Sequence, residues 1–377
     1  SYIVDEYTKG TKSEDIHLEI TELIQKYNHP TESHTVQTKD GYILNIYRIP
    51  NKGPVVFLMH GLLSSSDDWV TAGPKSSIAI LLASEGYDVW MGNARGNKHS
   101  RRHTNLSPED PKFWDFSWDE IGRNDLPAMI DYVLQVTGEK TIKYVGHSQG
   151  TTSFFVMCSE RPEYNDKISL MVALSPVAWM SHLKSPIVRL LSPLNPFLFT
   201  TLKSFGLHEF LPPNLIIKTL QITFCGNQFV AELLCSNIVF LICGFDYEQL
   251  NVTNLPVFFS HVPSGAATKQ IVHYGQEVIS GKFRKFDYGE KLNQAKYNTK
   301  EPPSYPVERI TAAVALFYSV DDWLASVEDV EILRNKLKNV VEYYKVPYSK
   351  FNHLDFIWAK DVKKLIFDKL LTLLKKF

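Results

Sequence analysis

Short runs of apolar and β-branched residues alternate along the chain with segments of helical character, and this alternation is the feature that most limits the folds available to it. Such an order is typical of a parallel sheet covered by helices. Pro54–Met59 is apolar throughout, as expected of a strand buried on both faces. The other predicted strands are Tyr42–Arg48, Tyr87–Met91, Ile142–Gly146, Ile168–Leu174, Ile310–Phe317 and Val340–Lys345.

The alternation stops between about Val177 and Pro306. We interpret this stretch as a mostly helical cap inserted into the sheet, with most of its apolar residues forming the core of the cap itself. A segment so apolar and so often interrupted is also typical of a lid that faces lipid, so we expect part of it to contact substrate. Prolines at 186, 193, 196, 212 and 213 separate apolar segments that include Ile187–Leu191, Phe197–Phe199, Leu215–Leu220 and Leu233–Leu234.

The length and charge of the chain exclude several classes of protein. Its 377 residues suffice for one large α/β core with an inserted subdomain, or for two domains. With 40 basic and 41 acidic residues it lacks the basic excess of a nucleic-acid binder. No uninterrupted apolar run reaches the roughly 18 residues of a membrane span. The chain starts at Ser1 rather than Met, which is compatible with the removal of a leader.

Gly146-His-Ser-Gln-Gly150 fits the pattern G-x-S-x-G, and its context makes the match informative. The predicted strand Ile142–Gly146 leads into it, and Thr151–Cys158 has helical character. Strand, tight turn and helix form the elbow that exposes a nucleophilic serine in the α/β-hydrolase fold. The flanking glycines allow the backbone to approach neighbouring elements closely. We therefore predict that Ser148 is the nucleophile of an α/β hydrolase.

The same fold predicts where an oxyanion hole lies. One donor is the backbone N–H of the residue after the nucleophile, which is Gln149, and the other comes from an earlier strand-to-helix loop. His60-Gly-Leu-Leu63 directly follows the buried strand Pro54–Met59. We expect Leu62 to supply the second N–H, Gly61 to permit the close approach and the His60 side chain to be structural.

In this fold the triad follows the order serine, acid, histidine. Of the 12 histidines only His353 lies beyond the predicted cap, immediately after the last predicted strand, which selects it as the general base. The acid should follow Ile310–Phe317, where Asp321 and Asp322 are adjacent candidates that spacing cannot separate. Asp329 is a weaker alternative on the next helix. The chosen carboxylate would orient the imidazole and stabilise its charged form.

The cysteines and sequons carry less information. Cys225 and Cys235 enclose a short loop and are either a disulfide, which would imply an oxidising compartment, or two buried thiols. No Cys-x-x-Cys pair occurs, so a zinc site is not expected, and the predicted chemistry needs neither metal nor organic cofactor. Asn105-Leu-Ser and Asn251-Val-Thr are glycosylation sequons and lend slight support to secretion.

A set of motifs is distributed over nearly the whole chain, at Lys39–Leu44, His60–Leu63, Asp88–Gly96, Phe113–Trp118, Gly146–Gly150, Leu234–Asn237 and Asn352–Phe356. Together these motifs resemble the acid lipase family, which includes gastric and lysosomal acid lipases, and the likeness is greater to insect members than to vertebrate ones.

The resemblance implies hydrolysis of neutral lipid esters, triacylglycerols or sterol esters, at a lipid–water interface by a secreted or lysosomal enzyme. It implies an α/β-hydrolase core at 15–180 and 305–377 and a cap at 181–304 that contacts the lipid surface and contains a movable lid. Two alternatives stay open. One is a carboxylesterase acting on soluble short-chain esters, and the other is a non-catalytic lipid carrier, a class that usually loses the nucleophile.

The resemblance also bears on single residues. Ser319–Ser326 looks like the family stretch Gly-Gly-x-Asp-x-Leu-Ala-Asp, which places the catalytic acid at Asp322. Ser319-Val320 stands where the family has Gly-Gly, and Ser326-Val327 where it has Asp-Pro. Cys225 and Cys235 match a family disulfide, and Cys243 matches a free cysteine.

Overall fold

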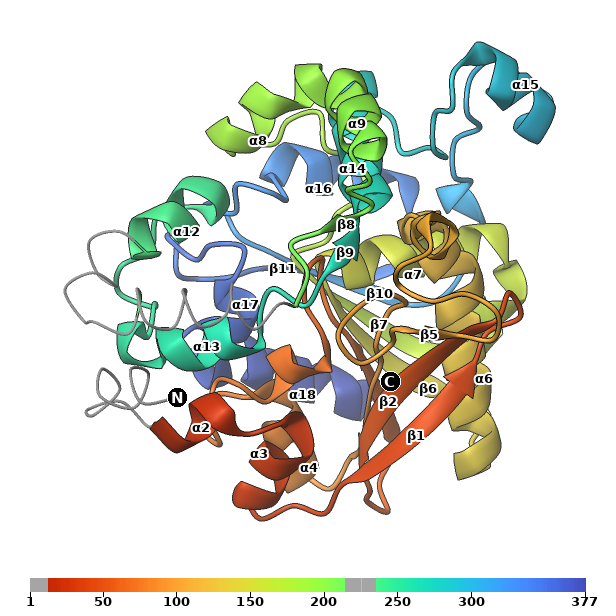
Figure 1. Cartoon of the computed structure of the whole chain (residues 1–377). Coiled ribbons are helices and arrows are strands. Elements are labelled where there is room, and N and C mark those ends of the chain that lie inside the picture. The colour runs from red at the N-terminus through yellow and green to blue at the C-terminus, as the bar shows by residue number, and fades with distance from the viewer. Residues whose placement is uncertain (1–12, 214–224, 226–234) are drawn as a thin grey trace.

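A computed structural model describes residues 13–213, 225 and 235–377, and within these residues it contains a nine-stranded sheet with the order β1-β2-β4-β3-β6-β7-β10-β11, plus β5 paired to β2 (Figure 1). The strands from β4 to β11 are parallel, whereas β2 is antiparallel to its neighbours β1, β4 and β5. The strands are β1 Glu32–Gln37, β2 Tyr42–Ile49, β3 Val55–Met59, β4 Asp88–Met91, β5 Arg102–His103, β6 Ile142–His147, β7 Ile168–Leu174, β10 Val314–Tyr318 and β11 Val340–Lys345.

All seven predicted strands are present, with two differences at the margins. The predicted strand Ile310–Phe317 begins only at Val314, because the backbone N–H groups of Thr311 and Ala312 donate to the side-chain oxygen of Asn165 instead of a neighbouring strand. The two-residue strand β5 was not predicted, and neither was strand β1. Strand β1 is polar, exposed at alternate positions and located at the edge of the sheet, so it lacks an apolar pattern.

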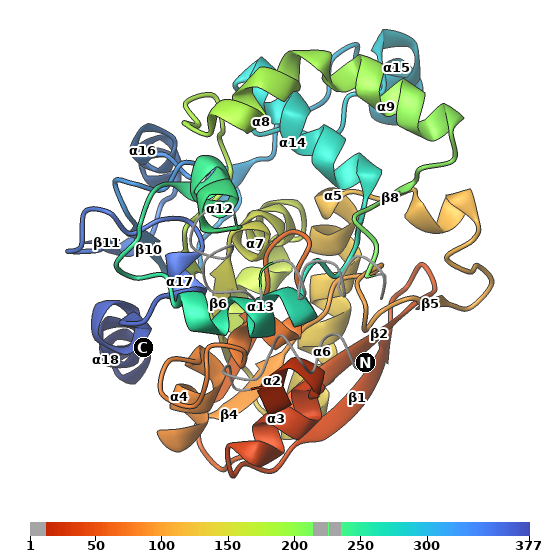
Figure 2. The same cartoon turned by 60° about the vertical axis from the view of Figure 1, so that its left-hand side comes forward.

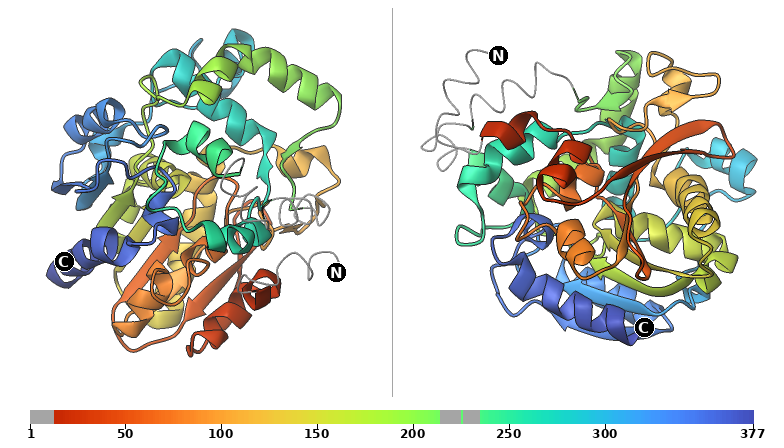
Figure 3. Two further views of the ribbon diagram at one scale, coloured as in Figure 1. Left: turned by 90° about the vertical axis from the view of Figure 1, so that its left-hand side faces the viewer. Right: turned by 90° about the horizontal axis from the view of Figure 1, so that it is seen from below.

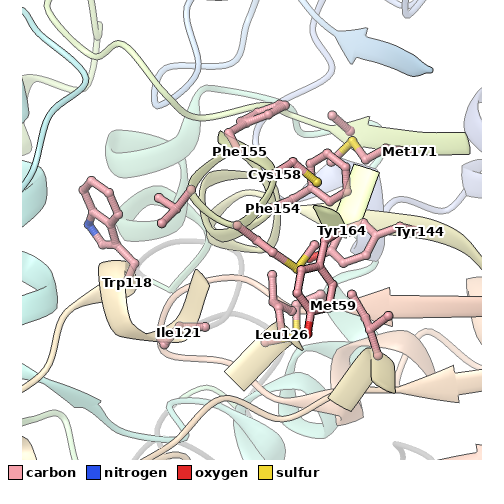
Figure 4. Packing of buried hydrophobic residues seen from close by; sticks show 14 of the residues in the cluster. Met59, Trp118, Ile121, Leu126, Tyr144, Phe154, Phe155, Cys158, Tyr164 and Met171 are labelled. Atoms are coloured by element: carbon pink, nitrogen blue, oxygen red, sulfur yellow. The ribbon is translucent and has the colours of Figure 1, made fainter. Parts of the chain in front are cut away.

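Helices cover both faces of the sheet. One apolar layer includes Phe154 of the helix α7 and Leu126 of the helix α6, and Figure 4 shows both among the side chains of this layer, together with Tyr144 of β6. The opposite layer includes Leu23, Leu82 and Leu370 of α3, α4 and α18 (Figure 3). The helices of the two layers and of the ends of the sheet are α2 Ser13–His17, α3 Ile20–Lys26, α4 Ile78–Ser84, α5 Trp118–Glu120, α6 Leu126–Thr137, α7 Gln149–Glu160, α16 Val327–Lys336, α17 Asp355–Trp358 and α18 Asp368–Lys376.

Between β7 and β10 the described chain leaves the large sheet and forms helices and a two-stranded sheet of β8 Glu209–Phe210 and β9 Ala266–Ala267. Figure 2 shows α8, α9 and α14 lying together above the sheet, with α13 beside α17, where the rings of Phe258 and Trp358 stack. The predicted apolar segments Leu215–Leu220 and Leu233–Leu234 lie outside the described residues. None of the described helices combines the length and hydropathy needed to cross a bilayer. The helices of this region are α8 Pro186–Leu191, α9 Asn195–Ser204, α12 Ser236–Cys243, α13 Leu255–His261, α14 Thr268–Ser280 and α15 Glu290–Tyr297.

Candidate active site

Ser148 lies in the turn between the end of β6 at His147 and the start of α7 at Gln149. Its φ of 53° and ψ of −113° are unfavourable for a residue with a side chain, and such strain is concentrated at functional sites. Both predicted glycines are required by space. A Cβ at Gly146 would lie 2.7 Å from the carbonyl oxygen of Gly150, and one at Gly150 would lie 2.2 Å from that of Met59. The sequence thus forms the strained turn that holds a serine hydroxyl above the sheet.

The hydroxyl of Ser148 faces His353 across the carboxyl end of the sheet. Oγ of Ser148 lies 2.8 Å from Nε2 of the imidazole. His353 is buried, and its loop is held by the backbone N–H of His353, which donates to the carbonyl oxygen of Cys243 at 3.4 Å. This distance permits direct proton transfer from the hydroxyl to the imidazole.

Asp322 completes a hydrogen-bonded chain. Its Oδ1 lies 3.0 Å from Nδ1 of His353 and accepts the backbone N–H groups of Leu324 and Ala325. Burial alone would raise the pKa of Asp322, but the charge of His353 and hydrogen bonds from His353, Ser175 and the Ala325 backbone hold that pKa below its usual value. An ionised carboxylate fixes the imidazole tautomer with a proton on Nδ1, which leaves Nε2 free to accept one.

Asp321 and Asp329, the two other candidates for the catalytic acid, do not face the imidazole of His353. The Asp321 side chain is directed towards Gly244, where a Cβ would come within 3.2 Å of its Oδ2. Burial, together with the charges of Asp246 and Asp322, raises the pKa of Asp321 to about 6. Asp329 lies 2.9 Å from Nδ1 of His182 and accepts the hydroxyl of Ser326. Neither of these carboxylates contacts His353 through any hydrogen bond within the described residues.

The predicted oxyanion loop passes close to the nucleophile. A Cβ at Gly61 would lie 3.3 Å from Cβ of Ser148, so the backbone that leads into Leu62 passes close to the serine and leaves little room for a larger residue. Leu62 is partly exposed, and the next residue, Leu63, has a φ of 63°. Gln149 is the first residue of α7, whose leading N–H groups have no partner within the helix. Gln149 thus directly follows Ser148 and the loop that carries Leu62 passes beside the serine, while their role as oxyanion donors stays a prediction.

Two histidines of these motifs are buried and neutral. Nδ1 of His60 lies 2.8 Å from the carbonyl oxygen of Gly61, and its Nε2 accepts the N–H of Ala94, as a structural role requires. Burial lowers the pKa of His60 to about 4. Nε2 of His147 lies 2.9 Å from the carbonyl oxygen of His353, and burial with the nearby His353 lowers the pKa of His147 to about 3. His147 therefore donates to the loop that carries the imidazole.

Two family models match this chain. One, described as a partial α/β-hydrolase lipase region, covers residues 20–73, and the other, described as the α/β hydrolase fold, covers residues 54–208. Lipase 3 of Drosophila melanogaster is 45% identical over 94% of this chain and 92% of its own length. Human gastric triacylglycerol lipase is 39% identical over 97% of this chain and 92% of its own length. Human lysosomal acid lipase/cholesteryl ester hydrolase is 40% identical over 96% of this chain and 92% of its own length.

The chain belongs to the acid lipase family. As a member of this family with the α/β-hydrolase fold, it is a serine ester hydrolase. Among solved structures, a lipase-like protein from Sulfolobus solfataricus superimposes with a TM-score of 0.59 at 13% identity, covering 89% of this chain and 90% of that one, which supports the shared fold.

The cysteines of this acid lipase are arranged as the family resemblance implies. Cys225 and Cys235 form a disulfide, while Cys243 and Cys158 are buried free thiols. Burial raises the pKa of the Cys243 thiol well above its usual range. No group of three or more His, Cys, Asp or Glu side chains suited to a metal ion occurs within the described ranges.

The departures from the family pattern have structural roles in this acid lipase. The hydroxyl of Ser319 donates to the carbonyl oxygen of Phe351, two residues before the imidazole, at 2.5 Å. The side chain of Ser326 accepts the N–H of Asp329 and caps the N-terminus of α16. Both serines therefore stabilise the loops around the acid and the histidine without replacing either.

Sequence reasoning missed Ser175, the residue that follows β7. Its hydroxyl contacts both Asp322 and Nδ1 of His353. It also missed Asp67, a fully buried carboxylate that accepts hydrogen bonds from His99 and His261 and forms an ion pair with Lys98. Neither residue belongs to a motif, and only the position of Ser175 at the carboxyl end of a parallel strand could have drawn attention to it.

Proposed function

We propose that the protein is a lipase that hydrolyses neutral lipid esters with Ser148 as nucleophile, His353 as general base and Asp322 as the orienting acid. The observation that carries the proposal is the 2.8 Å contact between Oγ of Ser148 and Nε2 of His353, with Asp322 on the other side of the imidazole. The names of the relatives, a triacylglycerol lipase and a cholesteryl ester hydrolase, support triacylglycerols and sterol esters as the substrate class.

In the proposed reaction the imidazole removes the proton of Ser148 as its oxygen attacks the ester carbonyl carbon. The backbone N–H groups of Leu62 and Gln149 stabilise the oxyanion, and losing one such donor typically costs about 10²–10³ in rate. The protonated His353 then gives its proton to the departing alcohol, which leaves an acyl group on Ser148. Water attacks this acyl-enzyme with His353 again as base, releases the carboxylic acid and restores the serine.

The cap, proposed to span 181–304, supports contact with a lipid surface. Its first helices expose large apolar side chains to solvent, with Leu190 77%, Phe197 72% and Phe205 76% exposed. A concentration of exposed apolar residues on neighbouring helices marks a binding surface. Lys184, Arg189 and Lys203 are the charged residues of 184–204, so this stretch contains no carboxylate. These exposed apolar side chains therefore favour action on esters at a lipid–water interface over action on soluble esters.

The proposed compartment is extracellular or lysosomal. The disulfide between Cys225 and Cys235 supports an oxidising environment during folding, where such bonds persist. Of the two sequons, Asn105 is exposed and Asn251 is partly exposed, so both are proposed as accessible glycosylation sites. A carboxylesterase acting on soluble esters would use the same three residues, and the cap surface is the observation that separates it from a lipase.

The two functions are distinguished by comparing triolein emulsions with soluble p-nitrophenyl butyrate. We expect higher activity on the emulsion, and the double variant Leu190→Ser/Phe197→Ser should lose most of that activity while its rate on the soluble ester is retained. Val136→Ser, which changes an exposed apolar residue on α6 outside the cap, is the matched control and should alter neither rate. A triolein rate below the soluble-ester rate, or equal loss on both substrates, would favour the carboxylesterase. Absence of activity on both would favour the lipid carrier.

A further inference from the structure

Ser175 lies between the strands that deliver the nucleophile and the acid. It directly follows β7, whose neighbours in the sheet are β6 and β10. Its backbone N–H donates to the carbonyl oxygen of Phe317 in β10 at 2.9 Å, and the preceding residue, Leu174, accepts the N–H of Ser148 at 3.1 Å. Ser175 is fully buried and has a φ of 56°. The sheet therefore fixes this residue beside both ends of the hydrogen-bonded chain.

The hydroxyl of Ser175 makes two contacts. It donates to Oδ2 of Asp322, and its oxygen lies 2.7 Å from Nδ1 of His353. The other carboxylate oxygen, Oδ1, lies 3.0 Å from the same ring nitrogen. Within the described residues, Oδ2 accepts a hydrogen bond from this hydroxyl, whereas Oδ1 also accepts the backbone N–H groups of Leu324 and Ala325.

Only one arrangement of protons satisfies these contacts. A carboxylate has no proton to give, so the hydroxyl proton points to Oδ2, and the lone pairs of Oγ are left to accept. The proton on Nδ1 of His353 is then shared between Oδ1 of Asp322 and Oγ of Ser175. This arrangement locks the tautomer in which Nε2 is unprotonated and faces Ser148. It also prevents the carboxylate from rotating about its bond to Cβ.

We infer that Ser175 is a positioning residue that holds Asp322 and the imidazole of His353 in the geometry needed for proton transfer from Ser148. The inference rests on the proposed function, because Ser175 is assigned no contact with substrate and acts only through Asp322 and His353. Loss of the Ser175 hydroxyl should lower kcat and leave KM unchanged, since the hydroxyl binds no substrate group. The size of this loss should also depend on the charge of Asp322, through which the hydroxyl acts.

The experiment compares Ser175→Ala and Ser175→Gly with the unchanged enzyme on p-nitrophenyl butyrate, a soluble ester that removes interfacial binding from the measurement. Both variants lose the hydroxyl, but glycine accepts the φ of 56° without strain and alanine does not. A hydrogen bond to a charged group is lost in each case, so we expect kcat to fall by about tenfold or more in both, with KM within about twofold. Ser159→Ala removes another fully buried hydroxyl, on α7, and should leave kcat unchanged.

A second arm places Ser175→Ala in an Asp322→Asn background and measures the labelling rate of Ser148 by a fluorophosphonate, which remains measurable when turnover is slow. We expect the added substitution to cost less than about twofold there, because the charge through which the hydroxyl acts is gone. A cost as large as in the unchanged enzyme, or full kcat in both Ser175 variants, would overturn the inference. Ser148→Ala separates this from the proposed function, since activity retained in that variant would overturn the function itself.

Discussion

Gly61 lies against Ser148 so closely that a Cβ at position 61 would come within 3.3 Å of the serine Cβ and 3.4 Å of Nδ1 of His147. The backbone of Gly61 lies outside the left-handed region, so glycine is favoured there by the lack of space and not by its conformational freedom. The loop after β3 and the turn after β6 are therefore packed against each other, and the distance between Ser148 and the proposed oxyanion donor Leu62 depends on this contact.

Gly61→Ala should lower activity without unfolding the protein. The added methyl group is tight rather than impossible, so the loop carrying Leu62 is expected to shift by a few tenths of an ångström, and misplacement of catalytic groups can cost up to about 10²-fold in rate. We expect kcat on a soluble ester to fall and the thermal midpoint to change by only a few degrees. Full activity in this variant would contradict the expected shift of the loop that carries Leu62.

Asp125→Ala should destabilise the fold strongly. The buried guanidinium of Arg95 donates to Oδ1 of Asp125 at 2.8 Å and to both oxygens of Asp40. Removing Asp125 leaves that charge undercompensated in the interior, where breaking a buried pair typically costs about 3–5 kcal/mol. Urea denaturation measures the loss in free energy of unfolding.

The matched control for this prediction is Glu163→Ala, which removes an ion pair with Arg161 that is well exposed on both sides. Exposed pairs are worth less than about 1 kcal/mol, so its free energy of unfolding should stay close to that of the unchanged protein. An equal loss in free energy of unfolding in the two variants would contradict the claim that the buried pair contributes more to stability than the exposed one.

Asp68 should make the stability of the protein depend on pH between about 4 and 7. Burial raises the pKa of Asp68 to about 7, the charge of Asp67 adds to this rise and the Ser64 hydroxyl opposes it. In the unfolded chain an aspartate ionises near pH 4, so across this window the unfolded state has lost a proton that the folded state keeps. The contribution of Asp68 is therefore greatest below pH 4 and declines by roughly 1.4 kcal/mol per pH unit until pH 7.

Asp68→Asn tests this sign, because the amide cannot ionise. Relative to the unchanged protein, the variant should gain stability as pH rises from 4 to 7, and the difference should become constant above pH 7. Urea denaturation of both proteins at pH 4, 5.5, 7 and 8 provides the comparison. Parallel stability curves would contradict the raised pKa.

The sequence predicts those parts of the fold in which burial requires a regular pattern of apolar residues. Strand β3 is buried at every position, and a continuous apolar run is what such burial requires. Strand β1 was not predicted because it is polar and lies at an edge of the sheet, where neither face has to be apolar. The G-x-S-x-G motif predicted Ser148 and chain order predicted His353, since the fold fixes which strand ends carry them, and the structure places the two side chains within 2.8 Å.

The remainder of the site depends on where a turn directs its side chains. Asp321 and Asp322 differ by one position, and only the turn that brings the N–H groups of Leu324 and Ala325 onto Asp322 aims that carboxylate at His353. Ser175 meets this pair because β7 lies between β6 and β10, an order that has no local counterpart in the sequence. Long-range contacts of single hydroxyl groups leave no periodic pattern from which they could be predicted.

The measurement that tests the central claim most directly is covalent labelling by a fluorophosphonate, with the modified peptide identified by mass spectrometry. The account predicts one adduct, on Ser148, formed rapidly in the unchanged protein, much more slowly in His353→Gln, and not at all in Ser148→Ala. Rapid labelling that persists in Ser148→Ala, or a labelling rate unaffected by the loss of His353, would contradict the claim that these two residues act as nucleophile and base.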